Sequence, residues 1–212
     1  MDGCQTLSAR IHDSILELVI DSGGSSEGLL LTESELVERF GVSKAPIREA
    51  LLRLCAEEVL RSIPRCGYVV VQLGEKSGRE NLEVRKLLEL TTMDRYFDRF
   101  TPKKLDEIER HLNESLELCG REVSIWEIWQ ANMDFHCDLI SVSDNRYLEK
   151  HLRNCIEVER RYYAQNHYNS AKKFSQNYVP GAHENILKTI RKGNKEKALK
   201  LLESDIGDSN RF

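Results

Sequence analysis

Residues 31–54, with the sequence LTESELVERFGVSKAPIREALLRL, carry the signals of two short consecutive helices. Thr32 and Glu35 have the spacing of a capping box. In that motif the Thr side chain accepts a hydrogen bond from the third helical amide, and the Glu side chain accepts one from the amide of the cap residue. A helix is therefore predicted over about residues 33–40, and Gly41 supplies the turn that ends it.

A second helix is predicted to start after Ser43. Ser43 can cap this helix, and Pro46 is tolerated in its first turn, where a missing amide costs little. Apolar residues then recur at the spacing of one helical face, which is typical of a helix that packs against its own domain. This inward face consists of Ile47, Ala50, Leu51 and Leu54.

The flanking sequence extends this pair of helices into a larger unit. Upstream, apolar residues at helical spacing between Leu7 and Val19 predict another helix, which a Gly-Gly-Ser-Ser run ends. Downstream, the β-prone runs 60–63 and 68–71 flank Pro64-Arg-Cys-Gly67, whose glycine suits a tight hairpin turn. This order of elements predicts a winged helix-turn-helix, which we expect to span residues 1–73.

The rest of the chain is predicted to be helical. Residues 74–81 are polar and contain glycine, so we expect an interdomain linker there. From residue 82 to residue 212, helical patterning with almost no strand signal predicts an all-α bundle. The expected helices span residues 82–100, 102–119, 123–142, 145–166, 170–192 and 194–206. The fold class is therefore mainly α.

The charge distribution bears on the kind of partner. The chain has a formal net charge of -4, whereas a domain that coats phosphates usually has a basic excess. Residues 1–38 carry -7, but residues 39–65 carry +3, so basic charge is concentrated at the second helix and the hairpin. A short basic segment in an acidic protein predicts site-specific DNA binding with a modest non-specific background.

The helix after Ser43 has the features of a DNA recognition helix. Lys44 and Arg48 are one turn apart on the side opposite the apolar face, and Ser43 and Ala45 are small enough for close approach to DNA. Arg48 can bridge guanine O6 and N7 or bind a phosphate. The alternative is that these charges are simply solvated on an exposed helix.

The hairpin and the end of this helix add weaker candidates. Arg65 at the hairpin tip can enter an adjacent minor groove, whereas Arg53 is equally consistent with surface charge. Taken together, the candidate DNA-binding residues are Ser43, Lys44, Ala45, Arg48, Arg53, Arg65 and Gly67.

Residues 31–54, with Pro64-Arg-Cys-Gly-Tyr-Val69, resemble the winged helix of the GntR family of bacterial transcription regulators. The family's usual Val-Ser-Arg-Thr-Pro-Val-Arg-Glu-Ala-Leu occurs here with Lys44 in place of Arg and Ala45 in place of Thr. Ser34 stands where some members have a DNA-contacting arginine. These changes predict a different base preference. The resemblance implies a homodimer on a pseudo-palindromic double-stranded DNA operator, with repression as the usual effect.

The second half of the chain is similar to the helical C-terminal domain, called FCD, of the FadR subgroup. Six helices rather than seven indicate the VanR-like variant. The resemblance implies a ligand-binding and dimerisation domain over residues 82–212. The matching motifs are Val84-Arg85-x-x-x-Glu89, Phe135-His136-x-x-Leu139, Ser143-Asp-Asn145-x-x-Leu148 and His183-x-x-Ile186-Leu187-x-x-Ile190.

Many such domains hold a divalent metal ion through an Asp-x-x-x-His pair on one helix and a histidine on each of two later helices. The corresponding positions here are Asn132, His136, His183 and Asp205, so a carboxylate is retained at a different place. Residues i and i+4 share a helical face, so Asn132 and His136 can point at one ion. The ion expected is Zn²⁺, Ni²⁺ or Mn²⁺. The alternative is a polar pocket in which the imidazoles bind an organic ligand or each other.

Relatives use an inward arginine at the place of Arg85 to hold an anionic effector. The resemblance therefore implies a small organic acid or a metal-bound metabolite as effector, with Arg85, Glu89 and Tyr162 as its candidate contacts. The alternative for Arg85 is an internal ion pair with Glu89, because a buried guanidinium needs a partner.

The sequence thus predicts a ligand-responsive transcription regulator that is not an enzyme. No apolar run is long enough to span a membrane and no basic-then-apolar leader is visible, so a cytoplasmic protein is expected. The six cysteines form no Cys-x-x-Cys pair, which is typical of reduced thiols. Two alternatives stay open: a helical domain that only dimerises without a ligand, and a helical metalloenzyme built on His136 and His183.

Overall fold

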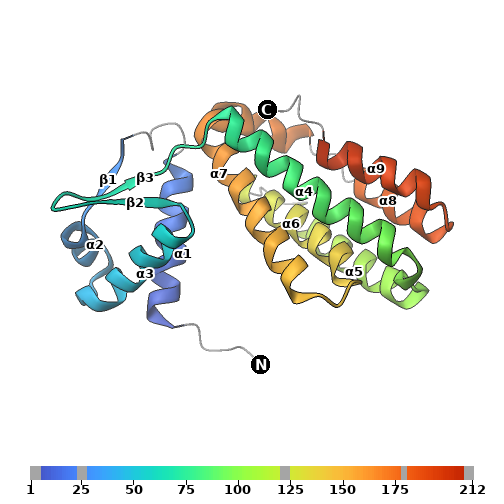
Figure 1. Cartoon of the computed structure of the whole chain (residues 1–212), viewed down its shortest axis with the longest axis horizontal. Coiled ribbons are helices and arrows are strands. Elements are labelled where there is room, and N and C mark those ends of the chain that lie inside the picture. Colours follow the sequence, from blue (N-terminus) through green and yellow to red (C-terminus); the bar gives the residue numbers. More distant parts are fainter. Residues whose placement is uncertain (1–5, 23–27, 120–124, 178–180, 208–212) are drawn as a thin grey trace. The chain divides into compact units, whose positions relative to one another are not determined.

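The computed structural model describes residues 6–22, 28–119, 125–177 and 181–207, whose elements are labelled in Figure 1. The chain divides into two compact units. The first contains residues 1–74 together with Arg161–Tyr168, and the second contains residues 75–160 and 169–212.

The described part of the first unit combines helices with a small sheet (Figure 1). The strands are antiparallel in the order β1-β3-β2, so β3 lies in the middle. This is the predicted winged helix-turn-helix, with β1 as an addition that is too short to show an alternating pattern in the sequence. In chain order the elements are α1 (Leu7–Asp21), β1 (Leu30–Leu31), α2 (Glu33–Phe40), α3 (Lys44–Ala56), β2 (Leu60–Ile63) and β3 (Gly67–Val70).

Local interactions fix the ends of α2 and the start of α3. The Thr32 hydroxyl accepts from the Glu35 amide at 3.2 Å, and the Glu35 carboxylate accepts from the Thr32 amide at 3.0 Å, so the predicted capping box is present. Gly41 ends α2 in the left-handed region with φ 64°. Ser43 occupies the N-cap position of α3, but its hydroxyl makes no capping hydrogen bond.

The turn between β2 and β3 requires unusual backbone angles. The Cys66 amide donates to the Ile63 carbonyl at 3.1 Å, and Arg65 has φ 64°, a position where glycine or asparagine is usual. Gly67 has φ 136°, and a Cβ there would lie 2.5 Å from the Leu31 carbonyl oxygen. Glycine is therefore required at position 67, because β1 passes close to its backbone.

The described part of the second unit is helical, which confirms the predicted all-α architecture. Helix α4 packs against α6 and α9, α5 packs against α6 and α8, and α8 packs against α9. The helices are α4 (Glu75–Tyr96), α5 (Pro102–Cys119), α6 (Ile125–Ser141), α7 (Arg146–Asn177), α8 (Gly181–Arg191) and α9 (Lys195–Gly207), with a 3-10 turn, η2 (Phe97–Arg99), after α4.

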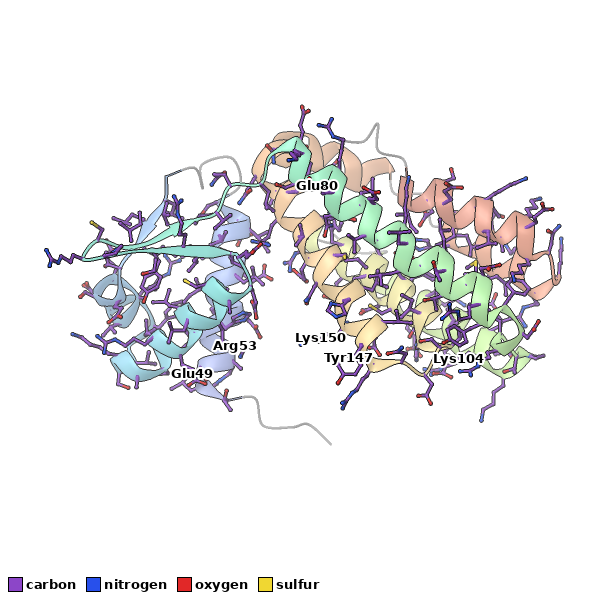
Figure 2. All side chains as sticks on the ribbon, in the orientation of Figure 1. Glu49, Arg53, Glu80, Lys104, Tyr147 and Lys150 are labelled. Atoms are coloured by element: carbon purple, nitrogen blue, oxygen red, sulfur yellow. The ribbon has the colours of Figure 1, made fainter. Side chains whose placement is uncertain are left out.

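The predicted linker over residues 74–81 is wrong, because helix α4 already begins at Glu75. Two exposed ion pairs at i,i+4 spacing lie in these first turns: Glu75 with Arg79 at 3.8 Å, and Lys76 with Glu80 at 3.6 Å (Glu80 is labelled in Figure 2). Such pairs support an exposed helical turn. The polar composition that indicated a linker therefore belongs to a solvated helix.

The predicted break at Asn169-Ser170 is also wrong. Helix α7 continues through both residues to Asn177, and α8 begins at Gly181 rather than near residue 170. Asn and Ser are weak helix formers, but each costs a helix interior only about 0.7 kcal/mol or less relative to alanine. That cost is too small to end a helix that is otherwise favourable.

The apolar core of the second unit lies next to buried polar side chains. Side chains of α4, α5, α6, α8 and α9 form this core, in which Ile108 and Ala198 are fully buried. Phe135 of α6 is also part of it, and the next residue, His136, faces polar partners. In the part of the chain that the structure describes, no helix combines the length and the apolar character needed to span a membrane.

Candidate DNA-reading surface and buried histidine cluster

Helix α3 has one buried face and one exposed face. Ile47, Ala50, Leu51 and Leu54 are completely buried against α1 and the sheet, so the helix cannot turn without exposing them. Fully burying a Leu or Ile side chain is worth about 1.5–3 kcal/mol. The candidate DNA-binding residues Lys44, Ala45, Arg48 and Arg53 are all exposed, and so is Ser43 just before the helix.

Arg48 is held by a residue that the sequence did not single out. Its Nε donates to both carboxylate oxygens of Glu33, at 2.9 and 2.8 Å, while the Arg48 side chain remains 61% exposed. The hydrogen bond to Glu33 raises the pKa of Arg48, so the guanidinium stays charged. Glu33 lies 15 positions away in the first turn of α2, so no local spacing rule pairs it with Arg48.

The other candidates on the first unit divide into two groups. Arg53 lies 3.9 Å from Glu57 at i,i+4 spacing, which is ordinary for a surface ion pair (Arg53 is labelled in Figure 2). Arg65 is exposed at the hairpin tip with a positive φ, a conformation that non-glycine residues adopt rarely and that is often found at functional sites. Gly67 follows it at the start of β3, where the backbone needs glycine.

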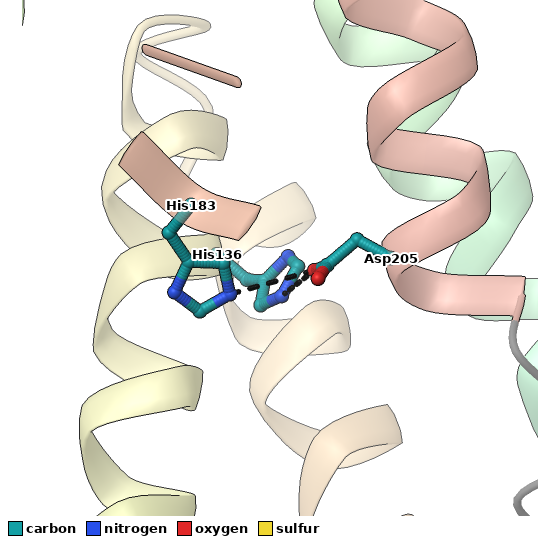
Figure 3. Close-up of side chains that lie close together, drawn as sticks. All are labelled: His136, His183 and Asp205. Carbon is teal, nitrogen blue, oxygen red and sulfur yellow. Dashed lines mark ion pairs between the residues drawn. The ribbon is translucent and has the colours of Figure 1, made fainter. Parts of the chain in front are cut away.

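A compact group of metal-binding side chains lies inside the second unit. His136 of α6, His183 of α8 and Asp205 of α9 each offer an atom within 4.8 Å of the others (Figure 3). Asp205 Oδ2 is 3.1 Å from His136 Nε2 and 3.4 Å from His183 Nε2. Both imidazoles are buried, and the carboxylate is 13% exposed. Three of the four predicted metal ligands therefore converge.

Neighbouring side chains fix the orientation of both rings. His136 Nδ1 is 2.6 Å from Glu89 Oε2, which leaves Nε2 facing Asp205. Phe135 stacks on His183, with ring centroids 3.9 Å apart and planes 14° apart. A carboxylate on the far nitrogen of a metal-binding histidine is the usual outer-shell arrangement, since it sets the tautomer and the ring orientation.

The environment of His136 Nε2 fits a bound cation. This atom is fully buried and lies 3.1 Å from Asp205 Oδ2, an ion-pair contact that lacks hydrogen-bond geometry. Leaving a buried polar atom unsatisfied is costly, and native proteins rarely do so without a water, an ion or a ligand. Two imidazoles and one carboxylate are also ligands that Zn²⁺ and similar ions accept in open sites. The side chains present therefore fit a divalent metal ion.

Asn132 stands apart from these three residues. It lies one turn before His136 on α6 and is half-buried. No hydrogen bond of its side chain to the cluster is found among the described residues. Its role as a fourth ligand stays a prediction from its spacing.

Arg85 and Glu89, the predicted effector contacts, form internal ion pairs. Arg85 Nε donates to Glu89 at 2.7 Å, and its Nη1 donates to Glu159 of α7 at 2.6 Å. All three side chains are at most 5% exposed. Arg85 therefore forms the internal ion pair with Glu89 that was the alternative to an effector contact. Glu159 is 74 positions from Arg85, so no sequence signal pointed to it.

Tyr162, the third predicted effector contact, is buried at 2% exposure on α7. It belongs to the stretch of α7 that groups with the first unit. The hydrogen bonds described for Arg85 go to Glu89 and Glu159 rather than to Tyr162.

Burial and pairing shift the pKa values of the three carboxyl groups in different directions. Burial raises the pKa of Glu159 despite its contact with Arg85. Burial also disfavours the charged form of Glu89, but His136 and Arg85 outweigh it and lower the pKa. For Asp205, burial is likewise outweighed, by the two adjacent histidines, so its pKa lies well below the usual range.

The two histidines also differ. Burial would lower the pKa of His136, but the adjacent Glu89 carboxylate outweighs burial and raises it. Burial lowers the pKa of His183, so this imidazole is neutral. A neutral imidazole is the form that binds a metal, and a proton on His136 competes with the ion for the same nitrogen.

The charged groups of this cluster do not balance. It contains three carboxylates, those of Glu89, Glu159 and Asp205, against one guanidinium, that of Arg85. The formal charge is -2 if all three carboxyl groups are ionised and both imidazoles are neutral, but the raised pKa values of His136 and Glu159 favour a proton on each, which reduces this charge. Uncompensated charge in a protein interior is strongly unfavourable, so the cluster needs positive charge from protons or from a cation.

Two protein families match this chain. Residues 7–70 match the family described as bacterial regulatory proteins, gntR family, and residues 80–208 match the FCD domain family. These matches coincide with the winged helix-turn-helix and with the helical bundle.

Relatives and solved structures agree with these families. The uncharacterized HTH-type transcriptional regulator YdhC of Bacillus subtilis (strain 168) is 28% identical over 193 residues, which cover 86% of this chain and 80% of YdhC. The gluconate operon transcriptional repressor of the same organism is 30% identical over 137 residues, or 63% of this chain and 54% of the repressor. The alignment thus spans about half of that repressor.

A solved structure, Escherichia coli McbR/YncC, superposes with a TM-score of 0.75 at 21% identity, covering 97% of this chain and 95% of that one. At this identity the likeness shows the fold. The matched families and relatives are transcription regulators rather than enzymes.

Proposed function

Since the chain belongs to the gntR family of bacterial regulatory proteins and carries an FCD domain, we propose that it represses a metabolic operon from a pseudo-palindromic operator, as a homodimer that responds to a signal in its helical domain. DNA-binding transcriptional regulation follows from the family. The operator symmetry, the dimer, the signal and the sign of regulation are our proposal. Such a protein would act in the cytoplasm, where bacterial DNA lies.

One observation carries the DNA-reading part: α3 buries its apolar face completely and exposes Lys44, Ala45 and Arg48 on the other. In the major groove, the Arg48 fork would bind guanine O6 and N7 or a phosphate, and Lys44 would neutralise a phosphate. Arg65 at the hairpin tip would enter the adjacent minor groove. Because Arg48 Nε pairs with the Glu33 carboxylate at 2.8 Å, the contact to DNA would use the terminal nitrogens of the same guanidinium.

The test of this role is the Arg48→Ala variant on operator fragments that the wild-type protein selects from random DNA. Losing a bidentate contact to guanine should lower affinity roughly ten- to hundredfold and relax the preference at one base pair. Arg110→Ala is the matched control, because Arg110 is an exposed arginine of α5 in an i,i+4 ion pair. Equal affinity of the Arg48 variant and the wild-type protein across salt concentrations would exclude the proposed contact.

An exposed apolar pair on α4 supports the homodimer. Val84 is 47% exposed and Leu87 is 63% exposed, one helical turn apart. The neighbouring Leu82 is buried in the core, so the leucine-rich stretch divides between core and surface. A two-fold dimer could cover the exposed pair, and Leu87→Glu should then lower the molecular mass measured by light scattering.

We further propose that the helical domain holds one divalent metal ion between His136, His183 and Asp205. The convergence of one ligand atom from each of these three side chains within 4.8 Å, with both imidazoles buried, supports this site. When bound, the ion supplies positive charge and joins three helices. Neighbouring residues position the two histidine ligands: Glu89 orients His136, and Phe135 orients His183. Asp205 provides the anionic ligand.

Metal analysis of purified protein tests this site. After exposure to Zn²⁺, Ni²⁺ or Mn²⁺ and removal of excess ion, the wild-type chain should retain one ion, and His183→Ala should retain much less. His151→Ala is the control, since His151 is exposed on α7. Retention of the same amount of metal by wild-type protein and His183→Ala would count against the site.

A further inference from the structure

We propose that Glu33 determines the base specificity of helix α3, because it holds Arg48 for a guanine and cancels the charge with which Arg48 would otherwise bind a phosphate. This inference rests on the DNA-reading role proposed above, and it chooses between the two contacts that the sequence leaves open for Arg48. It follows from the geometry of one ion pair, from the exposure of its two side chains, and from its net charge.

The ion pair leaves one end of the Arg48 guanidinium available to DNA. Both carboxylate oxygens of Glu33 accept from Arg48 Nε, at 2.9 and 2.8 Å, and this nitrogen carries a single hydrogen. The hydrogen bonds described for Arg48 all use Nε, so the N–H groups of the two terminal nitrogens remain for a ligand. One N–H group from each terminal nitrogen can donate to guanine O6 and N7 side by side.

Glu33 is the more firmly held partner of this pair. Its side chain is 24% exposed, whereas that of Arg48 is 61% exposed. Glu33 is also the first residue of α2, where the helix dipole favours a negative charge. The carboxylate therefore stays in place, and it confines an exposed arginine that would otherwise sample many rotamers. A donor that is confined before binding loses less conformational entropy when it meets a base.

The net charge of the pair argues against a phosphate contact. A guanidinium and a carboxylate 2.8 Å apart sum to zero charge, so they displace few counterions from DNA, and the carboxylate repels an adjacent phosphate. The guanine edge is different, because O6 and N7 are neutral acceptors that need donors rather than net charge. An arginine paired in this way contributes base readout rather than phosphate neutralisation.

Lys44 provides the contrast within the same helix. It is exposed one turn before Arg48, and no ion pair of its side chain is found among the described residues. Its charge can therefore neutralise a phosphate, and each such contact makes the slope of log affinity against log salt steeper by about 0.9. Lys44 thus supplies affinity that depends on salt, while the pair of Arg48 and Glu33 supplies specificity.

Glu33→Gln tests this division, because it keeps the shape of the side chain and removes its charge. Glu38→Gln is the matched control, since it makes the same charge change at an exposed position of α2. The double variant Glu33→Gln/Arg48→Ala removes the whole pair without changing the net charge, and Lys44→Ala removes the contrasting lysine.

Fluorescence anisotropy over a range of salt concentrations measures the affinity of each full-length variant for three kinds of DNA. These are a fragment that the wild-type protein selects from random sequence, the same fragment with each base pair changed in turn, and a fragment of random sequence. Thermal unfolding of each variant shows whether the fold is kept.

In Glu33→Gln the unpaired guanidinium should bind phosphates, so random DNA should be bound about threefold more tightly, with a salt slope steeper by about 0.9. The preference for guanine at one base pair should fall about fivefold or more. The melting temperature should stay within about 3 °C of the wild-type value, because a partly exposed ion pair adds little stability. Glu38→Gln should behave as the wild-type protein does.

The other two variants should separate specificity from salt dependence. The double variant Glu33→Gln/Arg48→Ala should lose the same guanine preference and keep the wild-type salt slope. Lys44→Ala should keep the guanine preference and lose about 0.9 of the slope.

The outcomes distinguish this inference from the DNA-reading role of Arg48. If the double variant kept the wild-type affinity and its preference at every base pair, the DNA-reading role would fail, and this inference with it. If the double variant lost about 0.9 of the slope and no base preference, Arg48 would be a phosphate contact, and the inference alone would be refuted. The inference would also be refuted if Glu33→Gln weakened binding to both selected and random DNA, as a purely structural role predicts, or if Glu38→Gln gave the same gain on random DNA.

Discussion

Replacing Arg85 by Met tests the buried ion pairs of the second unit. Met has similar length and no charge, so Glu89 and Glu159 lose their cation while they stay at 1% and 3% exposure. Breaking a buried pair by removing one partner costs about 3–5 kcal/mol. Glu89 keeps His136 at 2.6 Å, so most of the loss comes from Glu159. We expect about 4 kcal/mol, which lowers the melting temperature by roughly 8–16 °C.

The loss should depend on pH with a definite sign. Burial raises the pKa of Glu159 even with Arg85 present, so removing Arg85 raises it further. A carboxyl whose pKa is higher in the folded state binds a proton on folding, so the variant recovers stability as the pH falls. The pKa of Glu89 is lowered in the wild-type protein, whose stability therefore declines as the pH falls through the acidic range. The gap between the two proteins should narrow from pH 8 towards pH 5.

Thermal unfolding followed by helical circular dichroism at several pH values measures this gap. Arg110→Met is the matched control, because Arg110 and Glu114 form an i,i+4 pair in which both side chains are about 60% exposed. An exposed pair is worth less than about 1 kcal/mol. The reasoning would be refuted if Arg85→Met were no more destabilising than Arg110→Met, or if its effect did not change with pH.

Two further predictions concern the hairpin and the thiols. Gly67→Ala should cost about 1–3 kcal/mol in denaturant unfolding, because its Cβ would lie 2.5 Å from the Leu31 carbonyl, while Gly74→Ala, with open space around it, should cost less than about 1 kcal/mol; equal costs would contradict the close approach. Burial raises the pKa of Cys137 to about 12 and that of Cys155 to about 11, so neither thiol should react with iodoacetamide in the native protein at pH 8, as peptide mass mapping would reveal.

Local signals explain why the first unit could be predicted. The capping box of Thr32 and Glu35 is complete within four residues, and the inward face of α3 is complete within three turns. The same kind of signal was present at the start of α4, where Lys76 and Glu80 are at helical spacing. Composition misled there, because polar residues with glycine are typical both of linkers and of solvated helical turns. The i,i+4 spacing of the charged residues predicted this helical turn more accurately than the composition did.

The cluster in the second unit could be predicted in part. The positions of His136, His183 and Asp205 follow from a family motif, and the fold brings them within 4.8 Å. Glu159 could not be predicted in the same way, since its contact with Arg85 joins two helices 74 positions apart. Contacts of this kind depend on tertiary packing and leave no periodic trace in the sequence.

The charge of the helical domain shows why packing matters for function. Residues 75–212 contain equal numbers of basic and acidic residues, so their overall composition indicates no electrostatic demand. Folding separates these charges: most of the described basic side chains are exposed, while three carboxyl groups and one guanidinium are brought together in the second unit. Solvent screens the charges at the surface, but it does not screen those in the interior. The carboxylates in the interior therefore depend on positive charge that packing brings to them, from Arg85, from a proton on His136 or from a bound cation.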